Sequence, residues 1–139
     1  DTGTFETISV VDKLLAAGAT VTVVSRHEQL GAMIPYPPAT VEASRERLFG
    51  AGVEFVPSMA IRSIDATSVT AYGLGNTLER AFEADTVCIV TYHEPNDGLV
   101  EHLARLDVLP FSVTTIGNAN GTDSIQHAIH SAARATRHL

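Results

Sequence analysis

The sequence contains one cysteine, no tryptophan and only nine lysine and arginine residues in 139 positions. One cysteine excludes a disulfide framework within the chain and leaves no cysteine cluster to hold an iron-sulfur centre. The basic residues are scattered and are outnumbered by 16 acidic residues, so the formal net charge is -7. Without a basic stripe the chain offers no electrostatic footprint for phosphate backbones, and we expect no nucleic-acid partner.

Long hydrophobic runs are also missing. None approaches the roughly 18 apolar residues of a membrane-spanning helix, and the acidic start does not resemble a signal peptide. We therefore expect a cytoplasmic protein with no membrane partner. The hydrophobic fraction of 45% still supports one core of ordinary size. Cys88 lies in the apolar run 86–90, and we expect a buried, unreactive thiol there.

The beginning of the chain combines a helical pattern with a strand pattern. Apolar residues at helical spacing over residues 5–17 stop at Gly18, and the β-branched run 20–24 follows as a strand. The next stretch, 26–38, is expected to be a loop because it contains Pro35, Pro37 and Pro38.

A second helix is expected over residues 41–49, with Thr40 as its N-cap and residues 50–52 as its end. Its charged residues are expected to be exposed; they are Glu42, Arg45, Glu46 and Arg47.

The middle of the chain changes from helical periodicity to alternation. Residues 53–56 form a short apolar strand pattern. Alternating apolar and polar residues then predict a three-stranded antiparallel β-meander over 60–65, 68–72 and 77–82. The wholly apolar run 86–90 is expected to return to the parallel sheet, because such a strand needs cover on both faces.

The last third predicts a helix over residues 99–106, a strand over 111–116, a turn over 117–121 and a final helix over 122–138. The fold class expected is therefore α/β: a Rossmann-like parallel sheet with helices on its faces and the β-meander as a crossover. We expect the first strand of the βαβ unit to be missing from the chain, because the pattern opens directly at the loop that would follow it.

The opening loop is a candidate nucleotide site. Gly3 stands at the middle glycine of a G-x-G-x-x-G phosphate loop, whereas Asp1 and Glu6 replace the outer two glycines. Gly3, Thr4 and Phe5 could offer backbone N–H groups to a pyrophosphate. Two carboxylates at this place would oppose such binding by several kcal/mol at an effective dielectric constant of about 20. The alternative is structural: Asp1 caps the helix and Glu6 complements its dipole.

A second candidate site follows the strand 20–24. Ser25 and Arg26 stand where an acidic residue usually holds the ribose of NAD, and they favour the 2'-phosphate of NADP. The alternative is an ordinary surface arginine. Two histidines at i, i+3, His127 and His130, with Asp123 one turn earlier, suggest zinc, but the sequence positions no further ligand and we expect no metal site.

Three local strings resemble signatures of flavoproteins with two dinucleotide-binding domains. Residues 84–87 are similar to A-D-x-V, residues 90–96 to A-T-G-x-x-P-N, and residues 116–119 to I-G-D-A. With the D-x-G-x-x-E opening, the chain most resembles the C-terminal region of old yellow enzyme-related flavoproteins: 2,4-dienoyl-CoA reductase, trimethylamine dehydrogenase and histamine dehydrogenase.

This resemblance implies a division into two parts packed as one compact unit. Residues 1–94 would be an NAD(P)-type domain lacking its first strand, and residues 95–139 would return to an outer FAD- or ADP-type domain. Thr91 would lie at the cofactor, and Tyr92, in place of the family's glycine, would fill the space of the nicotinamide half. Gly117 and Asn118 would meet the flavin nucleotide, with Asn118 replacing an aspartate.

The resemblance also implies that FMN and an iron-sulfur cluster belong to a barrel domain upstream, which would be a partner of this chain. Two functions follow. In one, the chain is a fragment of a flavin-dependent NADH or NADPH oxidoreductase that binds NADP or NAD and delivers hydride to a flavin elsewhere. In the other, it is a non-catalytic scaffold with a degenerate nucleotide site. The isolated chain is expected to be inactive, and its unpaired sheet edge favours a homodimer.

Overall fold

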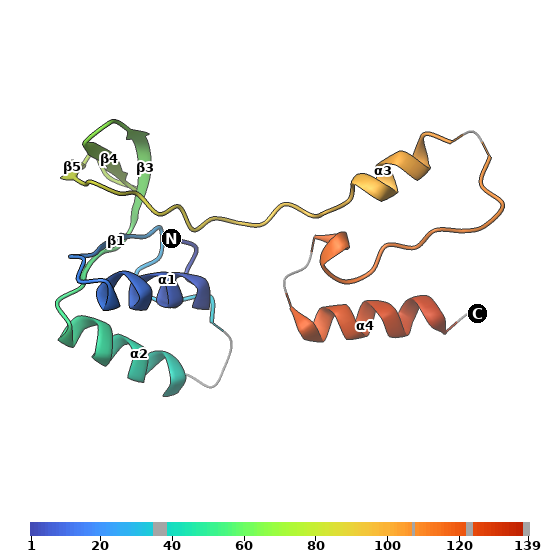
Figure 1. Ribbon diagram of the computed structural model, residues 1–139, viewed down its shortest axis with the longest axis horizontal. Helices are drawn as coiled ribbons and strands as arrows, with labels where there is room; N and C mark the ends of the chain where they lie inside the picture. Colours follow the sequence, from blue (N-terminus) through green and yellow to red (C-terminus); the bar gives the residue numbers. More distant parts are fainter. Residues whose placement is uncertain (35–38, 107, 122–123, 138–139) are drawn as a thin grey trace. The chain divides into compact units, whose positions relative to one another are not determined.

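The computed structural model describes residues 1–34, 39–106, 108–121 and 124–137 (Figure 1). They form two compact units, Asp1–Thr91 and Tyr92–Leu139, and each unit is considered by itself. The expected loop 26–38 is described only to residue 34, and its three prolines lie outside the described residues. No helix in the described ranges is long and apolar enough to cross a membrane.

The first unit opens with two helix–strand pairs. Helix α1 (Phe5–Ala16) leads to strand β1 (Thr22–Val24), and helix α2 (Ala39–Gly50) leads to strand β2 (Glu54–Val56). β1 and β2 pair in parallel, with Val23 opposite Phe55. Gly18, at a φ of 80°, ends α1 as expected, because its left-handed backbone lets the Ala19 N–H reach the Leu14 carbonyl at 3.1 Å.

The main core lies between these helices and the parallel strands. Its buried members are Ile8, Val11, Val21, Val23, Leu30, Leu48 and Val53. α1 and α2 lie side by side (Figure 1), joined at the surface by two hydrogen bonds from the Arg47 guanidinium to the Asp12 carboxylate, at 3.2 and 2.6 Å. Because both side chains of this ion pair are about half exposed, the apolar core supplies most of the stability.

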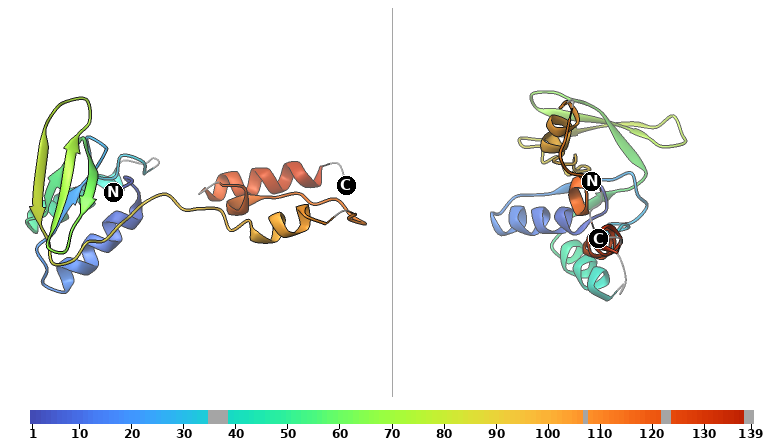
Figure 2. Two further views of the ribbon diagram at one scale, coloured as in Figure 1. Left: turned by 90° about the horizontal axis from the view of Figure 1, so that it is seen from above. Right: turned by 90° about the vertical axis from the view of Figure 1, so that its right-hand side faces the viewer.

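The expected β-meander is present. Strands β3 (Met59–Ile64), β4 (Ser68–Gly73) and β5 (Glu79–Glu83) form an antiparallel sheet in sequence order, side by side in Figure 2. A small second core of Val56, Met59 and Ala71 joins this sheet to the end of β2. At its edge Arg80 bonds Glu54 at 2.7 Å, which lowers the pKa of the Glu54 carboxyl group.

The parallel sheet predicted from the sequence is only partly present. The α/β class is confirmed, but the described residues contain one parallel pair of strands and not a larger Rossmann-like sheet. Residues 86–90 and 111–116, both expected to be strands, have no strand pairing. An apolar segment becomes a strand only beside a hydrogen-bonding neighbour, and among the described residues no strand lies beside residues 86–90.

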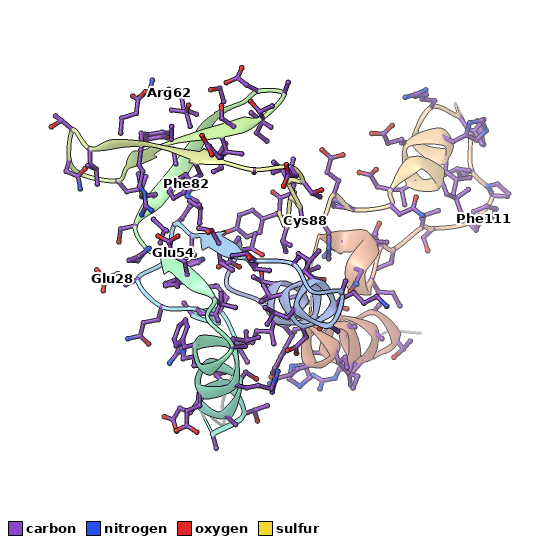
Figure 3. All side chains as sticks on the ribbon, turned by 60° about the vertical axis from the view of Figure 1, so that its left-hand side comes forward. Glu28, Glu54, Arg62, Phe82, Cys88 and Phe111 are labelled. Carbon is purple, nitrogen blue, oxygen red and sulfur yellow. The ribbon has the colours of Figure 1, made fainter. Side chains whose placement is uncertain are left out.

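Two smaller expectations are also wrong. Cys88 is exposed, because the segment that carries it is not covered by a sheet (Figure 3). Thr40 does not cap α2: the helix already includes Ala39, so Thr40 lies inside its first turn.

The second unit consists of α3 (Gly98–Ala104), the short 3-10 helix η1 (Gly117–Asn120) and α4 (Ile125–Thr136). α3 and α4 fall within the expected helices 99–106 and 122–138 apart from one added residue at Gly98. Residues 107, 122, 123, 138 and 139 lie outside the described ranges. Ser131 is the buried residue of α4, and its hydroxyl accepts the Gly117 N–H at 3.1 Å. This bond links η1 to α4.

We expect Leu48→Ala to lower the free energy of unfolding by about 2–5 kcal/mol, because Leu48 is fully buried in the main core. Leu78→Ala is the matched control, since Leu78 is 57% exposed in the same unit and its truncation should cost under about 0.5 kcal/mol. Urea unfolding followed by circular dichroism measures both. Equal losses for the two variants would contradict the assigned core.

Candidate functional site

The candidate nucleotide loop lies at the carboxyl end of β1, directly before α1. The Asp1 nitrogen donates to the carbonyl of Val24, the last residue of β1, at 3.1 Å, and burial lowers the pKa of this amino group. Gly3 follows with a φ of 77°, a left-handed conformation that favours glycine. In open α/β sheets this end of the strands is where ligands bind.

The Asp1 carboxylate occupies the inside of the loop. Its Oδ1 accepts the Gly3 backbone N–H at 2.7 Å and also the Thr7 hydroxyl. Its Oδ2 is buried and has no hydrogen-bond partner among the described residues. The N–H group expected to hold a pyrophosphate is therefore already bonded to an anion from the chain itself.

The alternative to a nucleotide site was that Asp1 caps α1 and Glu6 complements its dipole. The structure agrees with this alternative only for Glu6. The N-cap of α1 is Thr4, and its side chain makes no capping bond. Asp1 lies three positions earlier, so it stabilises the turn before the helix and does not cap it. Glu6 is exposed in the first turn, where a carboxylate complements the helix dipole, and it accepts the Thr4 hydroxyl at 3.2 Å. Phe5, also expected at the site, begins α1 and is 46% exposed.

The segment after β1 folds over the Gly3 turn. His27 Nε2 lies 3.1 Å from the Thr2 carbonyl oxygen, and the Met33 N–H donates to the Gly3 carbonyl at 2.9 Å. A Cβ built on Gly3 would come within 2.9 Å of His27 Cδ2 and 3.2 Å of the Met33 nitrogen. The space next to Gly3 is thus filled by protein.

Ser25 and Arg26 are not brought together as a phosphate site. Ser25 is 1% exposed, and its hydroxyl accepts the His27 N–H at 3.1 Å, which holds the start of the covering segment. Arg26 is exposed to solvent. The alternation of inward and outward residues that continues from β1 separates the two side chains.

The remaining predicted residues lie outside this loop. Thr91 ends the first unit and is exposed. Tyr92 begins the second unit and is 65% exposed, and its expected place in the nicotinamide space stays a prediction. In the second unit, Gly117 has a φ of 62° and begins η1, whereas Asn118 is exposed. The described residues hold no group of three or more histidine, cysteine, aspartate or glutamate side chains arranged for a metal ion, and Asp123 lies outside them.

Sequence reasoning missed the residues that close the loop and a cavity beside them. Thr7, His27 and Met33 reach the loop only in the folded chain, and no local sequence motif identifies them. The cavity, about 410 Å³, lies between the covering segment and α2 and includes His27 and Arg45 in its lining. Arg45 was expected to be exposed but is half-buried, and its Nε donates to the Leu30 carbonyl at 2.8 Å.

No family model matches the chain, and no curated protein matches it. Solved structures do match. The 6-hydroxypseudooxynicotine amine oxidase of Pseudomonas geniculata N1 is 28% identical over 96% of this chain, with a TM-score of 0.82. Histamine dehydrogenase from Rhizobium sp. 4-9 is 24% identical over 100% of it, with a TM-score of 0.85. A 2-naphthoyl-CoA reductase, solved with 2-naphthoyl-CoA, is 19% identical over 94% of it, with a TM-score of 0.74.

These neighbours are old yellow enzyme-related flavoproteins. The resemblance expected from the sequence is confirmed. This chain is therefore similar to a domain of flavin-dependent oxidoreductases. It spans 20%, 22% and 19% of the three matched chains, about a fifth of each.

We expect Gly3→Ala to destabilise the chain more than Gly18→Ala. Both glycines have positive φ, 77° and 80°, so both variants carry similar backbone strain of about 1–2 kcal/mol. Only at Gly3 would the added methyl group meet protein atoms, whereas no atom lies within 4 Å of a Cβ at Gly18. The difference in unfolding free energy should be about 1–3 kcal/mol. Equal losses in thermal or urea unfolding would show that the covering segment does not close on Gly3.

Proposed function

We propose that this chain is a module of a larger flavin-dependent oxidoreductase, and that its first unit is a Rossmann-like, dinucleotide-binding-type domain acting as a non-catalytic scaffold. The observation that supports the scaffold role is the hydrogen bond from the Gly3 N–H to the Asp1 carboxylate. The chain's similarity to flavin-dependent oxidoreductases supports the first part.

The closed turn opposes dinucleotide binding in two ways. A pyrophosphate approaching Gly3 would meet the Asp1 carboxylate, and two like charges about 4 Å apart repel by about 4 kcal/mol at an effective dielectric constant of 20. That equals the whole binding free energy of a ligand with a millimolar dissociation constant, about 4 kcal/mol. The ligand would also have to displace His27 and Met33, which cover the glycine.

The partner proposed for this module is the rest of a longer polypeptide, including a barrel domain that binds FMN and an iron-sulfur cluster. The second unit supports this, because its described side chains bury little apolar surface. Its exposed large hydrophobic residues are Tyr92, Leu99, Leu106, Val108, Phe111, Val113, Ile116, Ile125 and Ile129. Phe111 is labelled in Figure 3. Surfaces of this kind are normally covered by another domain. An FAD- or ADP-type outer domain completed by that polypeptide would use Gly117 and Asn118.

A second candidate function is hydride delivery from NADPH or NADH. It is favoured by the left-handed Gly3 turn at the end of β1 and by the exposed Arg26, which could meet a 2'-phosphate. The two candidates differ in whether the Gly3 turn opens to a ligand.

An NMR titration separates them. We expect the amide signals of Gly3, Thr4 and Phe5 to stay unchanged when NADPH or NADH is added to the chain at millimolar concentration. Asp1→Gly combined with His27→Ala should open the turn and produce shifts at these amides. Glu42→Gln is the control, because it removes an exposed charge on α2 and leaves the Asp1 carboxylate and His27 in place.

Micromolar binding of NADPH that shifts the Gly3 amide of the unmodified chain would overturn the scaffold proposal. It would establish hydride delivery as the better account.

We also propose that the isolated chain associates through the free edge of β1. Among the described strands, β1 pairs only with β2. The Val24 carbonyl of β1 accepts a hydrogen bond from the Asp1 nitrogen. An uncovered strand edge invites pairing with another copy. Size-exclusion chromatography at two concentrations should show a shift toward dimer at the higher one. A monomer at both concentrations would contradict this association.

A further inference from the structure

The segment that follows strand β5 has the composition of a strand but no neighbour to pair with. Five of the six residues 86–91 are β-branched, and the segment contains no charged residue, proline or glycine. Residues of this kind have a high strand propensity. The segment runs on from β5 as an extended chain (Figure 1), yet among the described residues it has no strand pairing and no backbone hydrogen bond.

Solvent reaches both faces of this extended segment. Val87 and Ile89, which lie on one face, are 40% and 71% exposed, and Cys88 on the other face is also exposed. Unpaired N–H and C=O groups along an uncharged strand form a template for another strand. The segment offers a longer edge than β1, which has three residues and whose Val24 carbonyl already accepts the Asp1 nitrogen.

The partner that fits this segment is itself an uncharged strand. A charged side chain placed against Val87 or Ile89 would lose water and gain no ion pair, because residues 86–91 carry no charge. A second copy of the chain supplies the same uncharged, β-branched segment. Residues 86–91 are therefore complementary to themselves.

Asp85, directly before the segment, decides the direction of pairing. In a parallel pair in register, the two Asp85 carboxylates would lie opposite each other, and like charges in this position are destabilising. In an antiparallel pair centred on Cys88, Asp85 lies opposite Thr91 instead. The same register places Val87 opposite Ile89, which is a favourable apolar pair.

We propose that two copies of this chain associate by antiparallel pairing of residues 86–91, with a two-fold axis at Cys88. Val87 of each copy contacts Ile89 of the other, and the two Cys88 side chains are neighbours on the opposite face. Residues directly opposite in an antiparallel pair have Cα atoms about 4.5–5.5 Å apart, a separation that a disulfide bond spans. Six residues from each copy bury far less than a standard interface of about 1,600 Å², so the dimer is weak and depends on concentration.

This inference goes beyond the proposed function, because it involves neither the Gly3 turn nor a dinucleotide. It also uses a different edge from that of β1. A dimer formed through β1 would not bring the two Cys88 thiols together. Either association can therefore fail without the other.

The first test traps the contact in the 139-residue chain with diamide. Two Cys88 thiols form one S–S bond, and their two hydrogen atoms reduce the N=N bond of diamide. The matched control, Thr86→Cys combined with Cys88→Ser, moves the thiol along the same face. In the antiparallel pair the two copies of position 86 lie about 14 Å apart along the strands, so this variant should cross-link at least about tenfold more slowly than the unmodified chain.

The second test needs no thiol chemistry. Ile89→Lys places a charge in the paired face and should raise the dissociation constant of the dimer at least about tenfold in analytical ultracentrifugation. Leu78→Lys is the matched control, because it adds the same charge at an apolar side chain that is 57% exposed in the same unit. This control should associate as the unmodified chain does.

Three results would overturn the inference: equal cross-linking rates with the thiol at position 86 or 88, unchanged association of Ile89→Lys, or equal weakening by both lysine substitutions. A dimer that persists in Ile89→Lys and shows no preferred cross-link at Cys88 would support the edge of β1 as the contact. The comparison of the two thiol positions decides the matter even if Ile89→Lys does not fold.

Discussion

The hydrogen bond from the Gly3 N–H to the Asp1 carboxylate, 2.7 Å long, determines what the carboxyl end of β1 can bind. In a phosphate loop the N–H of the corresponding glycine donates its hydrogen bond to an anionic ligand. Here the anion is part of the chain, and the Thr7 hydroxyl holds it in place. Once this turn is satisfied internally, His27 and Met33 can close over Gly3 without leaving its polar groups unpaired. This internal bonding is the basis of the proposal that the loop supports the fold and does not bind a dinucleotide.

The polar residues near this turn have different environments. Ser25 turns inward and holds the His27 N–H, Arg26 stays in solvent, and Arg45 reaches from α2 to the Leu30 carbonyl. The turn thus uses its own carboxylate inside the protein, and the Arg45 guanidinium ties α2 to the segment after β1.

Local patterns predicted most of the first unit. The helical spacing before Gly18 and the alternation of the β-meander depend only on neighbouring residues, and both match the structure closely. Residues 86–90 were predicted wrongly because an apolar run specifies burial but not its partner. Without a strand beside it, the run stays extended and Cys88 is exposed. The same reasoning applies to residues 111–116. At the candidate site, the sequence located the turn and the two acidic replacements but not the residues that cover it.

The sequence by itself determined the α/β class, the order of the helices and of the strands that are present, and the resemblance to old yellow enzyme-related flavoproteins, because these depend on periodicity and on short motifs. The tertiary structure alone decided which of the two acidic residues enters the turn. Asp1 and Glu6 are both carboxylates beside Gly3, yet Asp1 precedes the helix and reaches the Gly3 N–H, whereas the first turn of α1 carries Glu6 outward. That difference is one of backbone direction, which no pattern of residue types contains.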